Sequence, residues 1–160
     1  QGRWVEASEL LRNGLSLSPG YRTFSKLYAR TLMQLKQDKL AIAVLKKYAP
    51  SIESDPEYYA ILAALYQRQK DHMLAVQTYE KIVQIQPLNG VWWVGLGISL
   101  EALGKSKQAS QAYIQARKSG NLQNEIAHFT NNRLVVLDGE HVEDDLAFLA
   151  GLAARFHGAE

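Results

Sequence analysis

The sequence predicts an all-α fold in which antiparallel pairs of helices repeat along the chain. The first observation is a spacing of 34 positions between similar residues in the stretch 55–121. The second is that apolar residues recur at intervals of three and four, as they do on one face of a helix. The residues of one pair reappear in the next: Tyr59, Leu62, Ala63, Tyr66, Ala75, Tyr79, Ile82 and Pro87 correspond to Trp93, Leu96, Gly97, Leu100, Ala109, Tyr113, Ala116 and Asn121.

Small residues occupy the positions at which the two helices of each pair are expected to cross. Ala63 or Gly97 lies on the first helix, and Ala75 or Ala109 lies on the second. A larger side chain at such a crossing forces the helices apart. These residues are therefore expected to serve core packing rather than ligand binding.

The same register divides the whole chain. We expect a half repeat over residues 3–19, full repeats over 22–55, 56–89 and 90–123, a capping helix over 123–137, and an extra helix or tail over 138–160. The expected helices cover 3–17, 21–35, 39–48, 56–68, 73–85, 90–103, 106–119 and 123–137, with a break at 138–140 and a last helix over 141–158. In the first full repeat, Leu27, Tyr28, Leu32 and Leu35 are expected to point inward.

The half repeat corresponds to the second helix of a pair. Ala7 and Leu11 lie 34 positions before Ala41 and Leu45. A single helix without its partner leaves an apolar face exposed to solvent. We therefore expect residues upstream of Gln1 that complete it.

Composition argues against several classes of function. The 18 basic and 16 acidic residues nearly balance, whereas a nucleic-acid or anionic-membrane binder usually carries a basic excess. The absence of cysteine excludes disulfides and thiolate chemistry. No phosphate-binding loop or nucleophile motif is present, so we expect neither an enzyme nor a cofactor.

Two local features have alternative interpretations. His141 with its acidic neighbours is expected to be an acidic helix start rather than a metal site, because carboxylates are common at helix N-termini. Trp92 precedes the core tryptophan position, Trp93. We expect Trp92 to pack in the core, and the alternative is an exposed binding anchor.

These residues resemble the tetratricopeptide repeat (TPR) family, whose unit is 34 residues long. The resemblance implies a right-handed solenoid that binds a protein segment in its concave groove. In this family, five positions of each first helix line the groove. The matching residues are Thr23, Lys26, Arg30, Met33 and Gln34, then Glu57, Ala60, Ala64, Gln67 and Arg68, then Val91, Val94, Ile98, Glu101 and Ala102.

The candidate partner-binding residues among these are Lys26, Arg30, Met33, Gln34, Gln67, Arg68, Val91, Val94, Ile98 and Glu101. The candidate residues are mainly basic in the first two repeats, at Lys26, Arg30 and Arg68, and mainly apolar in the third, at Val91, Val94 and Ile98. The expected partner is a protein or peptide with an acidic part and an apolar part. The lysine and asparagine pattern of chaperone-binding TPRs is not matched.

Residues 89–104, 116–122 and 132–134 are also similar to TPR proteins of type IV pilus biogenesis, of the mannose-sensitive haemagglutinin (MSHA) kind. That similarity implies the periplasmic, soluble part of a membrane-anchored bacterial protein, with no membrane contact by this fragment. A cytoplasmic location is the alternative.

Two further alternatives remain open. A helical-repeat nucleic-acid-binding module is the rival function, which salt-sensitive micromolar binding of single-stranded RNA would support. The tail either caps the helix over 123–137, through Phe129 and Leu134, or forms a homodimer through the C-terminal helix.

Overall fold

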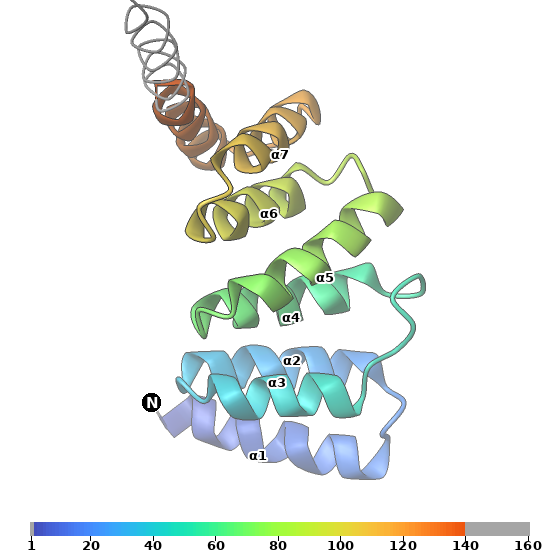
Figure 1. The fold of residues 1–160 in the computed structure, drawn as a ribbon. Helices are drawn as coiled ribbons and strands as arrows, with labels where there is room; N and C mark the ends of the chain where they lie inside the picture. The colour runs from blue at the N-terminus through green and yellow to red at the C-terminus, as the bar shows by residue number, and fades with distance from the viewer. Residues whose placement is uncertain (1, 140–160) are drawn as a thin grey trace, which may run out of the picture. The chain divides into compact units, whose positions relative to one another are not determined.

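The structure is a computed structural model and describes residues 2–139. It contains seven helices, α1 to α7, and an eighth over residues 124–139, and it has no strand within the described residues. The predicted all-α fold of helical hairpins is confirmed. The chain divides into two compact units, Gln1–Pro87 (unit 1) and Leu88–Glu160 (unit 2), and each is described by itself (Figure 1).

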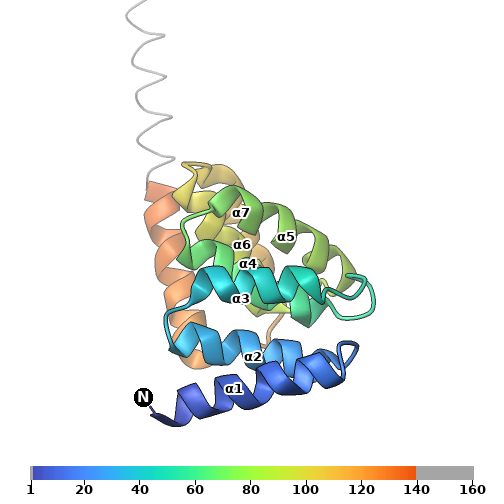
Figure 2. The ribbon, with the colours of Figure 1, turned by 90° about the horizontal axis from the view of Figure 1, so that it is seen from below.

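Unit 1 contains a single helix followed by two hairpins. The helices are α1 (Gly2–Leu17), α2 (Arg22–Gln34), α3 (Asp38–Lys47), α4 (Pro56–Arg68) and α5 (His72–Ile85). The pairs α2–α3 and α4–α5 are the hairpins, and α1 packs against α2 (Figure 2). Asp55 caps α4 and Asp71 caps α5, because each carboxylate accepts a hydrogen bond from an N–H of the first turn.

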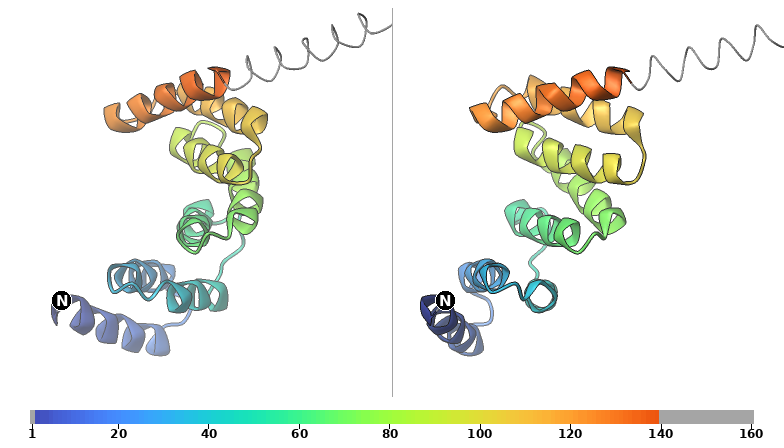
Figure 3. Two further views of the ribbon diagram at one scale, coloured as in Figure 1. Left: turned by 60° about the vertical axis from the view of Figure 1, so that its left-hand side comes forward. Right: turned by 90° about the vertical axis from the view of Figure 1, so that its left-hand side faces the viewer.

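Unit 2 contains the hairpin of α6 (Gly90–Ala102) and α7 (Ser106–Lys118), followed by the helix over residues 124–139 (Figure 3). Asn121 replaces the closing proline of the repeat. Its side chain donates to the carbonyl of Leu88 at 2.8 Å and accepts from the N–H of Gly90 at 3.3 Å. A Cβ on Gly90 would lie 2.2 Å from Oγ of Ser119, so this close approach requires glycine. These contacts position the start of α6.

The turn inside each hairpin has the same backbone geometry. Lys36, Lys70 and Gly104 occupy equivalent positions and have φ angles of 58°, 61° and 71°. The N–H of the next residue donates to the carbonyl of Leu32, Tyr66 or Leu100, at 2.8 to 2.9 Å. This left-handed ending of a helix favours glycine, which only the third hairpin has.

Replacing Lys36 or Lys70 with glycine is therefore expected to stabilise unit 1. The substitution removes a left-handed strain of roughly 1–2 kcal/mol, which the greater freedom of glycine in the unfolded chain partly offsets. A gain of up to about 1 kcal/mol in urea unfolding is the expected result. Lys39→Gly, inside α3, is the control and should destabilise; a loss of stability at Lys36 and Lys70 would contradict the argument.

The small residues lie in the cores of the hairpins, as predicted. Ala63, Ala75 and Ala109 are fully buried. A Cβ added to Gly97 would lie only 2.6 Å from the ring of Tyr113, so the α6–α7 crossing has no room for a larger residue. Trp92 is buried as well, as the packing interpretation expects.

Two sequence-based expectations are wrong. Leu27 is exposed, because α2 buries the face that carries Ser25, Ala29 and Leu32 instead. The break expected at 138–140 is wrong for residues 138 and 139, which are helical, because the helix continues past Leu137. Residue 140 and the predicted tail helix over 141–158 lie outside the described residues.

Candidate protein-binding surface

The candidate residues are distributed over three helices. Lys26, Arg30, Met33 and Gln34 belong to α2, Gln67 and Arg68 to α4, and Val91, Val94, Ile98 and Glu101 to α6. The first two groups lie in unit 1 and the third lies in unit 2. The surface of each unit is therefore built up separately.

Ion pairs join the N-terminal parts of α2 and α4 in unit 1. Nζ of Lys26 lies 3.2 Å from Oδ2 of Asp55 and 3.3 Å from Oε2 of Glu57. Nη2 of Arg30 lies 3.0 Å from Oε1 of Glu57. The side chains of Arg30 and Glu57 are 53% and 57% exposed, so this pair is screened by solvent and contributes little to stability.

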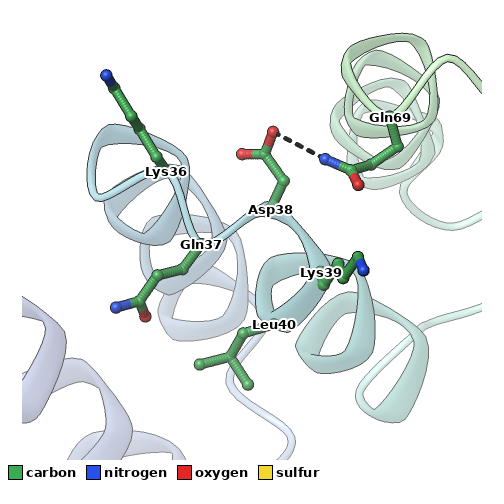
Figure 4. Close-up of a pocket in the computed structure, with 6 residues that line it drawn as sticks. All are labelled: Lys36, Gln37, Asp38, Lys39, Leu40 and Gln69. Carbon is green, nitrogen blue, oxygen red and sulfur yellow. Dashed lines mark hydrogen bonds between the residues drawn. The ribbon is translucent and has the colours of Figure 1, made fainter.

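The C-terminal end of α4 is held by a second set of contacts. Nε of Arg68 donates to Oδ2 of Asp38 at 2.9 Å, and its Nη2 donates to the carbonyl of Met33 at 3.3 Å. Gln69 donates to the same Asp38 oxygen at 3.3 Å. Figure 4 shows the carboxylate of Asp38 turned toward Gln69, with Lys36 and Lys39 pointing away from it. Arg68 thus joins the second full repeat to the first.

The basic residues predicted to line the groove are therefore paired with carboxylates of the same chain. The three cations, Lys26, Arg30 and Arg68, face three carboxylates, those of Asp55, Glu57 and Asp38. The groove position of Glu57 is a prediction from the sequence, whereas its pairing with Lys26 and Arg30 was not predicted. The signal was available in the separation of the partners by 27 to 31 positions, just under one repeat.

Gln67 and Glu101 are equivalent residues with the same role in their hairpins. Tyr79 donates its hydroxyl to Oε1 of Gln67 at 3.3 Å, and Tyr113 donates to Oε2 of Glu101 at 3.0 Å. Burial raises the pKa of Tyr79 to about 12. Burial, and after it the Glu101 carboxylate, raises the pKa of Tyr113 well above its ordinary value. Both phenols are therefore protonated donors at neutral pH.

The exposed residues of α6 give unit 2 an apolar surface. Val91 and Ile98 are 48% and 38% exposed, and Ala102 is also exposed. These residues are separated by seven and four positions, so they form one row along the helix. We call Val91, Ile98 and Ala102 the α6 row. Val94 is only 6% exposed and has little surface to offer a partner.

A charged pair borders the α6 row. The guanidinium of Arg133, on the helix over 124–139, binds the carboxylate of Glu101 with both Nε and Nη2, and the Nε contact is 3.1 Å. Val135 and Val136, the next exposed residues on that helix, add apolar surface to unit 2. A bidentate pair of this kind is well oriented, so Glu101 is held by the fold.

The described residues contain no group of three His, Cys, Asp or Glu side chains that could hold a metal ion. Within residues 2–139, no helix is both long enough and apolar enough to cross a bilayer. What the surface offers is exposed apolar side chains and oriented ion pairs. This chemistry suits the binding of a protein segment.

Comparison with known proteins supports the helical-repeat assignment. Two models of the tetratricopeptide repeat family match residues 1–65 and 56–87. No curated protein matches the chain. Among solved structures, the fold is similar to a crystal structure of MamA, with a TM-score of 0.66 and 16% identity, covering 89% of this chain and 92% of that one.

Two other structures have the same fold. The Sgt2 TPR domain from Aspergillus fumigatus matches with a TM-score of 0.66 and 20% identity, over 76% of this chain and 79% of that one. MamA from residue 41 to its end, from Desulfovibrio magneticus RS-1, matches with a TM-score of 0.67 and 21% identity, over 77% and 70%. At these identities the likeness concerns the fold alone.

Proposed function

This chain contains tetratricopeptide repeats and is a protein–protein interaction module, and we propose that it binds a partner segment whose apolar side chains pack on the α6 row. The observation that carries the proposal is the exposure pattern of α6. Most of this helix is buried, while Val91 and Ile98 remain exposed in one line. Exposed apolar surface that is bordered by polar groups is typical of interaction sites.

The geometry of the row limits the kind of partner. Val91 and Ile98 are separated by seven positions, which corresponds to roughly 10 Å along a helix. Two apolar side chains of the partner match this distance when they are seven residues apart in a helix or three apart in an extended segment. An amphipathic helix laid in a groove is one such mode of recognition.

Ile98→Glu is expected to weaken binding at least tenfold without unfolding the protein. The side chain is partly exposed, so the charge stays hydrated in the free protein, but a bound apolar partner would bury it. Peptides selected from a displayed library on the natural chain provide the probe, with Kd measured by fluorescence anisotropy. Gln111→Glu on the exposed face of α7 is the control. Equal Kd values for the natural chain and Ile98→Glu would reject the α6 row as the site.

Unit 1 offers a contact of its own, and we propose that an acidic group of a protein partner binds Arg30 there, in exchange for Glu57. Arg30 is suited to this because its side chain is half exposed, whereas Arg68 holds Asp38. Arg30→Gln is therefore expected to raise the Kd of an acidic peptide severalfold and to leave that of its amidated, neutral form unchanged. An equal change for both peptides would show that Arg30 does not contact the acidic group.

A more specific cellular role for this module is suggested by the sequence resemblance alone. Residues 89–104 resemble the MSHA type IV pilus biogenesis protein MshN, and on this basis we propose a role in pilus assembly in the periplasm. In a bacterium with MSHA pili, deletion of the gene should reduce the number of surface pili. Alkaline phosphatase fused after the repeats should be active, since that enzyme requires the periplasm. An inactive but intact fusion would place the repeats in the cytoplasm.

A further inference from the structure

The N-terminal ends of α3 and α5, in unit 1, leave apolar side chains exposed. Leu40 and Leu74 are 34 positions apart and therefore occupy the same place in their hairpins. They are 46% and 38% exposed, and Met73, beside Leu74, is 51% exposed. The equivalents of Met73 and Leu74 in α7, Lys107 and Gln108, are polar and exposed. The repeat itself therefore does not require apolar residues at these positions.

The two helix ends lie side by side. Gln69, at the end of α4, donates to the carboxylate of Asp38, the first residue of α3, at 3.3 Å. An open cleft of about 410 Å³ lies at this junction and is lined by residues 36–40 and Gln69 (Figure 4). A concave site of this kind can accept a side chain of a partner, which a flat surface cannot.

Lysines surround the exposed apolar side chains. Lys36 and Lys70 occupy equivalent turn positions, and Lys39 lies in the first turn of α3. Within residues 2–139, these three exposed side chains take part in no hydrogen bond or ion pair. The carboxylate of Asp38 is already paired, so the remaining carboxylate of the two turns is that of Asp71, the N-cap of α5. This part of the surface therefore carries an excess of positive charge.

We call Lys36, Lys39, Leu40, Lys70, Met73 and Leu74 the turn-end surface. We propose that it binds an acidic segment of a partner protein, whose carboxylates pair with the lysines and whose apolar side chains pack on the exposed leucines. Complementary charge selects an acidic segment, and the apolar contacts and the cleft favour a protein over a purely electrostatic partner. The proposal uses neither the α6 row nor Arg30, so it stands or fails separately from the proposed function.

Peptide selection on a chain that lacks both contacts proposed above tests the turn-end surface. This chain carries Arg30→Gln and Ile98→Glu, and the probe is a displayed library of short random peptides. The selected peptides are expected to combine acidic and apolar residues. Their Kd, measured by fluorescence anisotropy, should rise as the salt concentration is raised from about 0.05 to about 0.3 M, because salt screens exposed charges.

Two further substitutions place the binding on the turn-end surface. Leu74→Gln and Lys70→Gly each introduce the residue that the third hairpin has at the same position, so the fold tolerates them. The first is expected to raise the Kd about tenfold, and the second severalfold. Because glycine also relieves the left-handed turn, Lys70→Gly should lose affinity while unit 1 gains stability, which damage to the fold cannot produce.

Matched controls lie on the same helix. Ile85 is 37% exposed at the other end of α5, and Lys81 is exposed between the two ends. Ile85→Gln and Lys81→Ala remove a similar apolar area and a similar charge, so each should leave the Kd unchanged. Three results would overturn the proposal: selected peptides without acidic residues, a Kd that Leu74→Gln and Lys70→Gly leave unchanged, or equal losses in the two controls.

Two other occupants are distinguished by separate measurements on the natural chain. Co-sedimentation with phosphatidylglycerol vesicles that Leu74→Gln abolishes would assign the surface to an anionic membrane. Self-association in sedimentation equilibrium that Leu74→Gln abolishes would assign it to a second copy of the chain. Either result would overturn the assignment to an acidic segment of a partner protein.

Discussion

Raising the pH from 9 to 12 is expected to lower the free energy of unfolding of unit 1, with Tyr79 responsible for roughly 2 kcal/mol of the loss. Burial raises the pKa of Tyr79 to about 12, while an unfolded tyrosine titrates near 10. Because the folded-state pKa is the higher one, the stabilising contribution is complete below pH 10. It is lost as the pH rises toward 12, where the unfolded chain has already released its proton.

Urea unfolding between pH 9 and 12 measures this effect, and Tyr79→Phe isolates it. The variant should be less stable than the natural chain at pH 9, where it lacks the hydrogen bond to Gln67. It should depend less on pH above 10. Tyr21→Phe, at an exposed tyrosine, is the control and should keep the full pH dependence. The same pH profile for Tyr79→Phe and the natural chain would contradict the assignment.

Ala75→Leu and Ala109→Leu are each expected to destabilise their hairpin by roughly 1–3 kcal/mol. Both alanines are fully buried at a helix crossing, so the added side chain must push the two helices apart. The loss should be larger for Ala109, because its hairpin already needs Gly97 to accommodate the ring of Tyr113. Thermal and urea unfolding of the whole chain are the measurements.

Gln77→Leu and Gln111→Leu are the matched controls for these substitutions. Each lies two positions further along the same helix and is exposed, so its change in stability should stay within about 0.5 kcal/mol. If the alanine variants unfolded like these controls, the helices of the hairpins would have to cross elsewhere.

Much of the fold was predictable because its interactions are local and repeated. Small residues at the crossings, apolar residues at helical spacing and Asp at N-caps all act within one hairpin or one helix turn. The extent of α4, Pro56–Arg68, follows from such signals, since Asp55 caps a helix whose first residue is proline. The left-handed turns at Lys36 and Lys70 were less evident, because neither residue is glycine.

The candidate site was only partly predictable. The positions of the candidate residues on α2, α4 and α6 follow from the repeat. Whether each side chain is exposed or paired depends on its neighbours in the adjacent helices. The sequence predicts that Arg68 is available to a partner, whereas in the structure it forms an ion pair with Asp38. The sequence predicts that Val94 lines the groove, but its side chain is almost completely buried.

The sequence by itself determined that this protein is an array of helical hairpins, because a 34-residue period with small residues at fixed positions permits one kind of packing. Only the tertiary structure decided which side chains remain exposed for a partner. Exposure and ion pairing depend on residues roughly one repeat away, and no pattern within a single helix specifies how closely the next helix approaches. For that reason the exposure of the α6 row and the pairing of Arg30 with Glu57 could be recognised only in the structure.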